Sequence, residues 1–125
     1  MTAPRAYSVY VGHIRDAIQR ALQFTAGLNQ DQFTADQRTI YATVRALEIV
    51  GEAAKRVPDQ IRALDSTIPW RTMAGTRDVM IHRYDEVDLA EVWNIVHGDL
   101  EEMLPRLERL QRLLEQREDE EWERG

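Results

Sequence analysis

Three observations predict an all-α protein, an antiparallel bundle of four to five helices. Apolar residues recur at steps of three and four along most of the chain, which is the spacing of one helix face. No stretch of useful length alternates apolar and polar residues as a half-buried strand does. The connections between helical stretches are short, which favours antiparallel neighbours. With 125 residues, 43% of them hydrophobic, the chain is long enough for one domain around one core.

A polar stretch, residues 29–36, separates the first two predicted helices. The first helix begins near Tyr7 and ends at Gly27. Before the second helix, Thr34 and Gln37 have the spacing of a capping box, in which two side chains satisfy the free amides of a helix start.

Prolines mark the limits of the next elements. Pro58 stops the second helix, and residues 59–64 form a short helical turn within a connector. Pro69 suits the first turn of a third helix, which covers roughly residues 70–82. This helix is short, so packing against its neighbours must hold it.

Asp88 and Glu91 give a second capping-box spacing, and the fourth helix follows over residues 89–104. Pro105 lies inside the apolar pattern. Because proline lacks a backbone donor and clashes with the carbonyl four residues back, we expect a kink or a helix restart there. A last amphipathic segment, residues 107–114, completes the bundle.

Composition narrows the class of protein. A net charge of −6 is unlike a dedicated duplex binder, so any RNA contact must come from a local patch. The absence of cysteine excludes disulfides and thiolate metal sites. No apolar run is long enough to span a bilayer and no signal-peptide pattern is present, so we expect a cytoplasmic protein with no membrane contact. We divide the chain into a helical domain, residues 1–117, and a charged tail that frays, residues 118–125.

The strongest candidate for chemistry is the group Arg77, His82 and Tyr84 at the end of the third helix. Imidazole titrates near neutrality and serves as a general acid or base. Guanidinium supplies a bidentate fork for a phosphate that gains charge in the transition state. Arginine and histidine therefore suffice for RNA cleavage by 2′-hydroxyl attack without a metal ion.

The spacing of this pair leaves an alternative open. Five residues on an ideal helix lie about 140° apart. Arg77 and His82 converge only if the helix tightens or ends near His82, or if a second subunit contributes. A purely structural role, with Arg77 paired to Asp85 or Glu86 and His82 at a helix C-terminus, also fits the pattern.

The other histidines and the tryptophans favour structural roles. His13 and His97 have no second ligand at metal-binding spacing in their own helices. Trp70 and Trp93 stand at helix starts and are typical core anchors. For Trp122, which lies in the charged tail, the functional hypothesis is contact with a partner.

The motif Arg77-x4-His82-x-Tyr84 resembles the signature of HepT-like proteins of the HEPN superfamily. The resemblance extends over roughly residues 7–107. It includes three further segments in the same order: Arg45-Ala46-Leu47-Glu48-Ile49-Val50-Gly51-Glu52-Ala53-Ala54, Ile68-Pro69-Trp70 and Val92-Trp93.

The resemblance implies a HEPN-type bundle that forms a homodimer and acts as a metal-independent endoribonuclease toxin. Arg77 and His82 would be catalytic, and no cofactor or metal is expected. The implied partners are RNA and a minimal nucleotidyltransferase antitoxin, which would silence the toxin by AMPylation of Tyr84. Asp78 departs from the common asparagine: it could orient Arg77 or weaken phosphate binding.

Two other functions stay open. A catalytically silent HEPN dimer that binds a nucleotide or a protein partner agrees with the net charge of −6 and with Asp78. A structural interaction protein is the third hypothesis, and only the acidic tail supports it.

Overall fold

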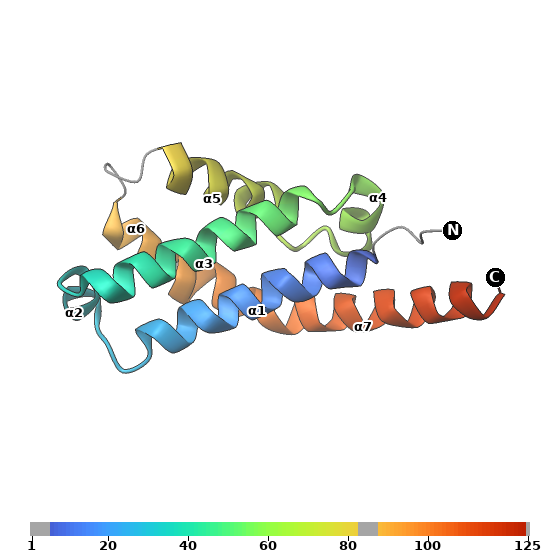
Figure 1. The fold of residues 1–125 in the computed structure, drawn as a ribbon, viewed down its shortest axis with the longest axis horizontal. Coiled ribbons are helices and arrows are strands. Elements are labelled where there is room, and N and C mark those ends of the chain that lie inside the picture. The colour runs from blue at the N-terminus through green and yellow to red at the C-terminus, as the bar shows by residue number, and fades with distance from the viewer. Residues whose placement is uncertain (1–5, 83–87, 125) are drawn as a thin grey trace.

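The computed structural model describes residues 6–82 and 88–124, with side chains up to Thr76 and from Asp88 onward. Helices run lengthwise through the bundle, and no strand occurs in these residues. Helix α3 lies between α1 and α5, and α7 packs along α1 (Figure 1). The prediction of an all-α antiparallel bundle is confirmed.

Helix α1 spans Tyr7–Thr25 and ends as predicted. Gly27 has a φ of +78°, a left-handed conformation that glycine adopts without steric cost. The polar stretch that follows contains a short helix, α2 (Gln30–Thr34), which the sequence pattern did not predict. Asn29 caps this helix in a full capping box with Gln32.

Helix α3 spans Gln37–Lys55, and its cap differs from the predicted one. The carboxylate of Asp36, not the Thr34 hydroxyl, accepts the hydrogen bond from the Thr39 amide, at 3.2 Å. Thr34 instead donates to the carbonyl oxygen of Asp31 within α2, at 2.9 Å. The capping-box spacing at Thr34 and Gln37 was therefore coincidental.

The connector after α3 contains α4 (Asp59–Arg62) and a 3₁₀ turn, η1 (Ala63–Asp65). The Arg62 guanidinium donates to the carbonyl oxygens of Val57 and Ala54, at 2.9 and 2.8 Å, and so satisfies the end of α3. Helix α5 follows over Trp70–His82, the limits that the sequence predicted.

The last part of the fold is one helical path in three segments. Helix α6 (Leu89–Asn94) has Asp88 as its N-cap, and the Asp88 side chain accepts from the amides of Ala90 and Glu91, which is the Asp88 half of the predicted capping box. The path continues as a π-helical segment, η2 (Ile95–Leu100), and then as α7 (Glu101–Arg124). The predicted restart at Pro105 does not occur, because α7 continues through it. The irregularity instead precedes the proline, because the π-helical segment ends at Leu100.

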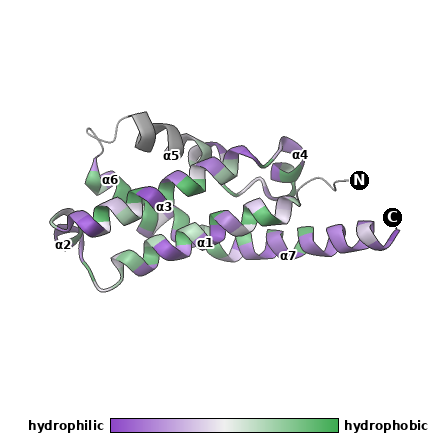
Figure 2. Ribbon diagram, viewed as in Figure 1, coloured by the Kyte–Doolittle hydropathy of each residue, from purple (hydrophilic) through white to green (hydrophobic). Residues whose placement is uncertain are grey.

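The core fills the spaces between these helices. Trp70 is buried, and its indole N–H donates to the carbonyl oxygen of Asp65 at 3.0 Å, so its predicted role as a core anchor is confirmed. Trp93 is half-buried against the fully buried Phe33, with ring centroids 5.5 Å apart. In Figure 2 the outer part of α7 is mostly hydrophilic, whereas hydrophobic residues are more frequent along α1, α3 and α6.

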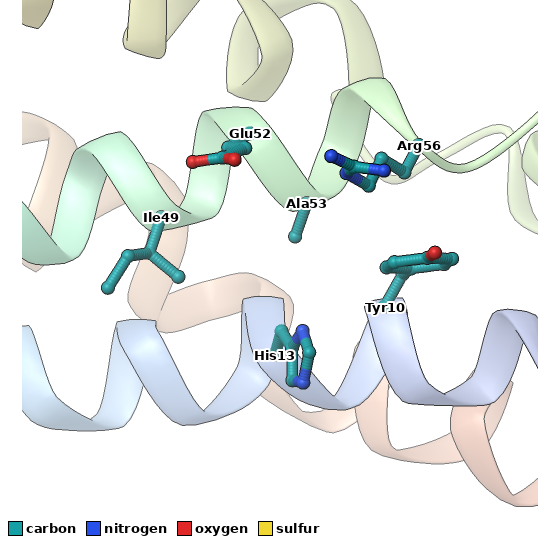
Figure 3. Close-up of a pocket in the computed structure, with 6 residues that line it drawn as sticks. All are labelled: Tyr10, His13, Ile49, Glu52, Ala53 and Arg56. Atoms are coloured by element: carbon teal, nitrogen blue, oxygen red, sulfur yellow. The ribbon is translucent and has the colours of Figure 1, made fainter. Parts of the chain in front are cut away.

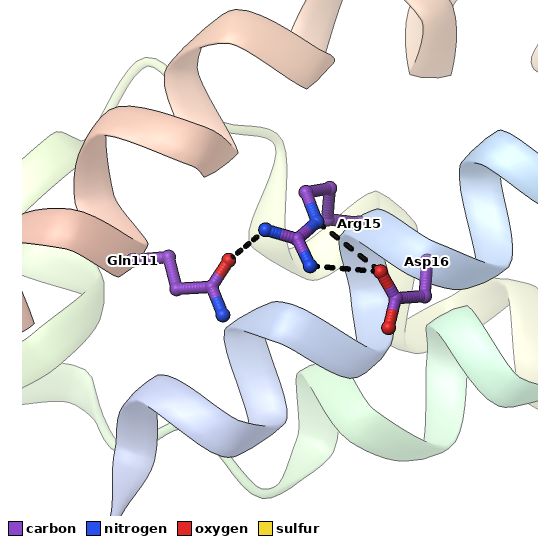
Figure 4. Close-up of polar contacts among 3 residues, drawn as sticks. All are labelled: Arg15, Asp16 and Gln111. Atoms are coloured by element: carbon purple, nitrogen blue, oxygen red, sulfur yellow. Dashed lines mark hydrogen bonds and ion pairs between the residues drawn. The ribbon is translucent and has the colours of Figure 1, made fainter. Parts of the chain in front are cut away.

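Two polar contacts join α1 to α7. The Arg15 guanidinium donates to the side-chain oxygen of Gln111 and also contacts the carboxylate of Asp16, at 2.9 Å (Figure 4). Nearer the start of α1, the carboxylate of Glu118 accepts from the amide and the hydroxyl of Ser8, at 3.1 and 2.6 Å. Residues 118–124 are helical in this structure.

Candidate functional site

Arg77, Asp78 and His82 belong to the last turns of α5. Their side chains lie outside the described residues, as does the whole of Tyr84. What the structure gives is their place in the fold: α5 packs on α3 and ends at the opposite end of the bundle from the C-terminus (Figure 1).

Helix geometry bears directly on the predicted pair. Helix α5 is α-helical throughout Trp70–His82, so it does not end before His82. Positions 77 and 82 of a regular helix are separated by about 140° around its axis. Because α5 ends at His82, a helix end near His82 stays open as a way to bring Arg77 and His82 together, beside the contribution of a second subunit.

The start of α5 is fixed firmly. Ile68 and Met73 are fully buried at this end of the helix, beside the anchored Trp70. The Thr76 hydroxyl is buried and donates to the carbonyl oxygen of Thr72 at 3.0 Å. The first two turns of α5 are thus anchored in the core through these buried residues, and positions 77–82 follow directly in the same helix.

Acidic charge is concentrated far from the end of α5. Residues 115–124 contain six acidic and two basic side chains, so this segment carries −4 of the chain's −6. It forms the outer end of α7, on the side of the bundle where α1 begins (Figure 1). The net charge therefore says little about the potential around α5, since exposed charges more than about 8–10 Å apart are largely screened at physiological salt.

A hollow of about 280 Å³ lies between α1 and α3. Figure 3 shows Tyr10 and His13 on α1 pointing towards α3, with Ile49 and Ala53 pointing back towards α1. The six residues that line this α1–α3 groove are Tyr10, His13, Ile49, Glu52, Ala53 and Arg56.

The walls of the groove are polar and its floor is apolar. The central carbon of the Arg56 guanidinium lies 5.9 Å from the centroid of the Tyr10 ring, within cation–π range. The Tyr10 and His13 rings meet edge to face, with centroids 6.3 Å apart. Within the described part of the chain, no hydrogen bond or ion pair engages the side chains of His13, Glu52 and Arg56.

Sequence reasoning missed this groove because its walls come from helices far apart in the chain. A signal existed within each helix: Tyr10 and His13 are three residues apart, and Glu52 and Arg56 are four apart. Both spacings place two polar or aromatic side chains on one helix face. Nothing in the sequence says that the two faces meet.

His97 has a structural environment, in agreement with the sequence interpretation. Its ring stacks on Trp93 with centroids 4.1 Å apart, and its Nε2 lies 2.8 Å from the Thr25 hydroxyl oxygen. That hydroxyl also contacts the Ala21 carbonyl oxygen, at 2.9 Å. His97 thus joins the π-helical segment to the end of α1.

Neither a metal site nor a membrane-spanning helix occurs in residues 6–82 and 88–124. No group of three or more His, Asp or Glu side chains is placed to hold a metal ion. No helix in these ranges combines the length and the apolar character needed to cross a bilayer.

Comparison with known proteins identifies the family. Residues 14–123 match the family model described as "Ribonuclease HepT-like". The chain is 37% identical over 108 residues to a "Probable ribonuclease HepT" of Thermococcus cleftensis, covering 86% of this chain and 98% of the relative. It is 34% identical to a "Putative RNase" of Caldanaerobacter subterraneus subsp. tengcongensis, over 82% and 89% of the two chains. No solved structure matches. The chain belongs to the HepT-like ribonuclease family.

Proposed function

We propose that this protein is a cytoplasmic endoribonuclease that cleaves RNA without a metal ion, using Arg77 and His82. The observation that carries the proposal is the combination of family and motif: the family match covers residues 14–123, and the Arg-x4-His-x-Tyr motif falls at the end of α5. Relatives described as ribonucleases cover most of the chain at 34–37% identity.

The proposed reaction needs only groups that arginine and histidine supply. His82 removes the proton of a ribose 2′-hydroxyl, and the oxygen attacks the adjacent phosphorus. The bond from phosphorus to the 5′-oxygen breaks, and that oxygen takes up a proton. The products are a 2′,3′-cyclic phosphate and a 5′-hydroxyl. Arg77 stabilises the extra negative charge on the phosphoryl oxygens in the transition state.

The regular geometry of α5 supports a homodimer as the active form. Positions 77 and 82 lie on different faces of one helix, so a single copy does not bring them together by helix geometry alone. A second copy placed against the end of α5 would bring its Arg77 near the first copy's His82. Because the acidic charge is segregated at the outer end of α7, the opposite end of the bundle, where α5 ends, is accessible to a polyanion such as RNA.

We further propose that a minimal nucleotidyltransferase acts as the antitoxin. In this reaction the Tyr84 oxygen attacks the α-phosphate of ATP, and pyrophosphate leaves. The product carries an adenylate two residues from His82. Its bulk and its negative phosphodiester would keep RNA away from the pair.

The nuclease proposal is tested by RNA cleavage in EDTA with wild type, Arg77→Ala, His82→Ala and the control Arg71→Ala. Arg71 is an exposed arginine on the same helix, so Arg71→Ala removes the same charge as Arg77→Ala without touching the motif. We expect losses of at least 100-fold in the two motif variants, the scale of a removed acid–base or oxyanion-stabilising group. Cleavage that persists in both folded variants would refute the assignment.

The regulatory proposal is tested by mass spectrometry after incubation with ATP and a minimal nucleotidyltransferase of the proposed antitoxin class. We expect added adenylate on the wild type and none on Tyr84→Phe, with loss of cleavage in step with modification. Modification at another residue would contradict this mechanism. Failure to cleave any RNA, with nucleotide binding retained, would favour the silent dimer instead.

A further inference from the structure

We propose that the α1–α3 groove binds a single nucleotide, with its phosphate at Arg56 and its base between His13 and Glu52. The site lies on a different helix pair from the motif, and it does not depend on the nuclease proposal. The inference rests on the shape of the groove, on the chemistry of its walls and on three side chains, His13, Glu52 and Arg56, that form no hydrogen bond or ion pair with the described residues.

The dimensions of the groove fit one nucleotide. Along α3 the lining residues extend from Ile49 to Arg56, a separation of seven positions that corresponds to about 10 Å of helix rise. Small-molecule sites usually enclose roughly 300–1,000 Å³. A hollow of about 280 Å³ is at the lower limit of that range, so a second nucleotide would extend into solvent.

One end of the groove suits a phosphate. The Arg56 guanidinium already lies over the Tyr10 ring, a contact that orients the guanidinium plane. Arg56 is exposed and forms no ion pair with the described residues, so its donors face solvent across the groove. A phosphate can accept two of these donors at once.

The other end suits a base. Ile49 and Ala53 form an apolar floor, and the exposed His13 ring stands beside it (Figure 3). Aromatic rings, including that of histidine, stack on bases in proteins that bind single strands. The Glu52 carboxylate lies across from His13 and only accepts hydrogen bonds when ionised. A base with an exocyclic amine, as in adenine, cytosine or guanine, is therefore favoured over uracil.

The distribution of charge also determines which end of the groove takes the phosphate and which takes the base. A phosphate next to Glu52 would meet a like charge, whereas at Arg56 it meets an opposite one. The base, which is neutral, therefore takes the end at Glu52 and Ile49. Neither an inorganic anion nor an apolar ligand would use both ends.

The experiment is an NMR titration of the full-length Arg77→Ala, His82→Ala double variant, in which the motif is disabled. The probes are AMP, CMP, GMP, UMP, adenosine, inorganic phosphate and a five-nucleotide single-stranded RNA. We expect saturable shifts centred on residues 49–56, with AMP at least five-fold tighter than UMP, phosphate or adenosine. If the RNA binds and no free mononucleotide does, the ligand is a nucleotide within an RNA strand. If both bind, the groove accepts a nucleotide whether it is free or part of RNA.

Variants test the individual contacts. Arg56→Ala and His13→Ala replace exposed side chains and should each weaken AMP at least five-fold, whereas the exposed Arg20→Ala on α1 should leave it unchanged. Glu52→Gln should reduce the preference for AMP over UMP. Three results would overturn the proposal: no saturable shift in the groove, equal affinity for phosphate and AMP, or a change of oligomeric state in His13→Ala that shows a second copy occupying the groove.

Because the motif is disabled in this titration, nucleotide binding and RNA cleavage are judged separately. A wild-type protein that fails to cleave RNA would refute the nuclease proposal and leave the groove intact. A groove that binds nothing would leave the cleavage assay unaffected.

Discussion

Glu118→Ala should destabilise the protein although it changes one residue near the end of the chain. The start of α1 has no capping side chain of its own: Ala6 occupies the N-cap, and the first turn contains no acidic residue. Glu118, from the outer part of α7, supplies what is missing by accepting from the amide and the hydroxyl of Ser8. We therefore predict that Glu118 caps α1 from a position 110 residues away in the chain.

The expected size follows from these two hydrogen bonds. Loss of an ordinary N-cap costs about 0.5–2 kcal/mol. Hydrogen bonds to a charged group are worth about 1.5–3 kcal/mol each, but the Glu118 side chain is half exposed, and water replaces part of what it loses. Ser8 is buried and would keep unsatisfied donors. We therefore expect a loss of about 2 kcal/mol in the free energy of unfolding for Glu118→Ala, and about 1 kcal/mol for Ser8→Ala.

Urea unfolding followed by circular dichroism measures these differences. Glu121→Ala is the matched control, since Glu121 is exposed in the same helix and the substitution has the same helix propensity. In the double variant Ser8→Ala, Glu118→Ala, the coupling energy should be about 1 kcal/mol. A Glu118→Ala midpoint equal to that of Glu121→Ala would show that the contact contributes nothing and that the cap reasoning is wrong.

Two further predictions concern α3. The pKa of the Asp36 carboxyl is lowered from 3.8, first by the hydrogen bond from the Thr39 amide, so its stabilising effect is present above 3.8 and is lost as the pH falls through the lower folded value. Acid titration of unfolding should show Asp36→Ala less stable than wild type at neutral pH, with the gap closing below pH 3.8; a gap that does not change with pH would contradict this. The Thr43 hydroxyl is fully buried and has no hydrogen-bond partner within the described residues, so Thr43→Val should raise the free energy of unfolding by about 1 kcal/mol in the same urea assay. A loss of stability in that variant would mean that the hydroxyl has a partner.

The sequence predicted α1, α3 and α5 well because their signals are strong and local. Helix α5 has the predicted limits, fixed by Pro69 before it and by the end of the apolar pattern. Helix α2 was missed because five residues are too few for a periodic pattern, although its Phe33 is fully buried. The cap of α3 was placed two residues early because Thr34 and Asp36 are both good capping residues.

Contacts between distant segments could not be predicted. The Ser8–Glu118 contact and the α1–α3 groove both depend on which helices become neighbours and on their register. The motif was found through local spacing and family resemblance. Its geometry stays a prediction, because the spacing of Arg77 and His82 is compatible with more than one arrangement of their side chains.

Because η2 is π-helical, the number of residues in it determines how α6 is oriented relative to α7. Val92, Val96 and Leu100 are all buried at steps of four, although each such step drifts by about 40° on a regular α-helix. The wider turn absorbs that drift. Removal of one residue between Ile95 and Leu100 would restore the regular helix and rotate α6 by about 100° relative to α7. Surface loops tolerate changes in length, but here a deletion would turn Val92 out of the core while every residue type around it stayed the same.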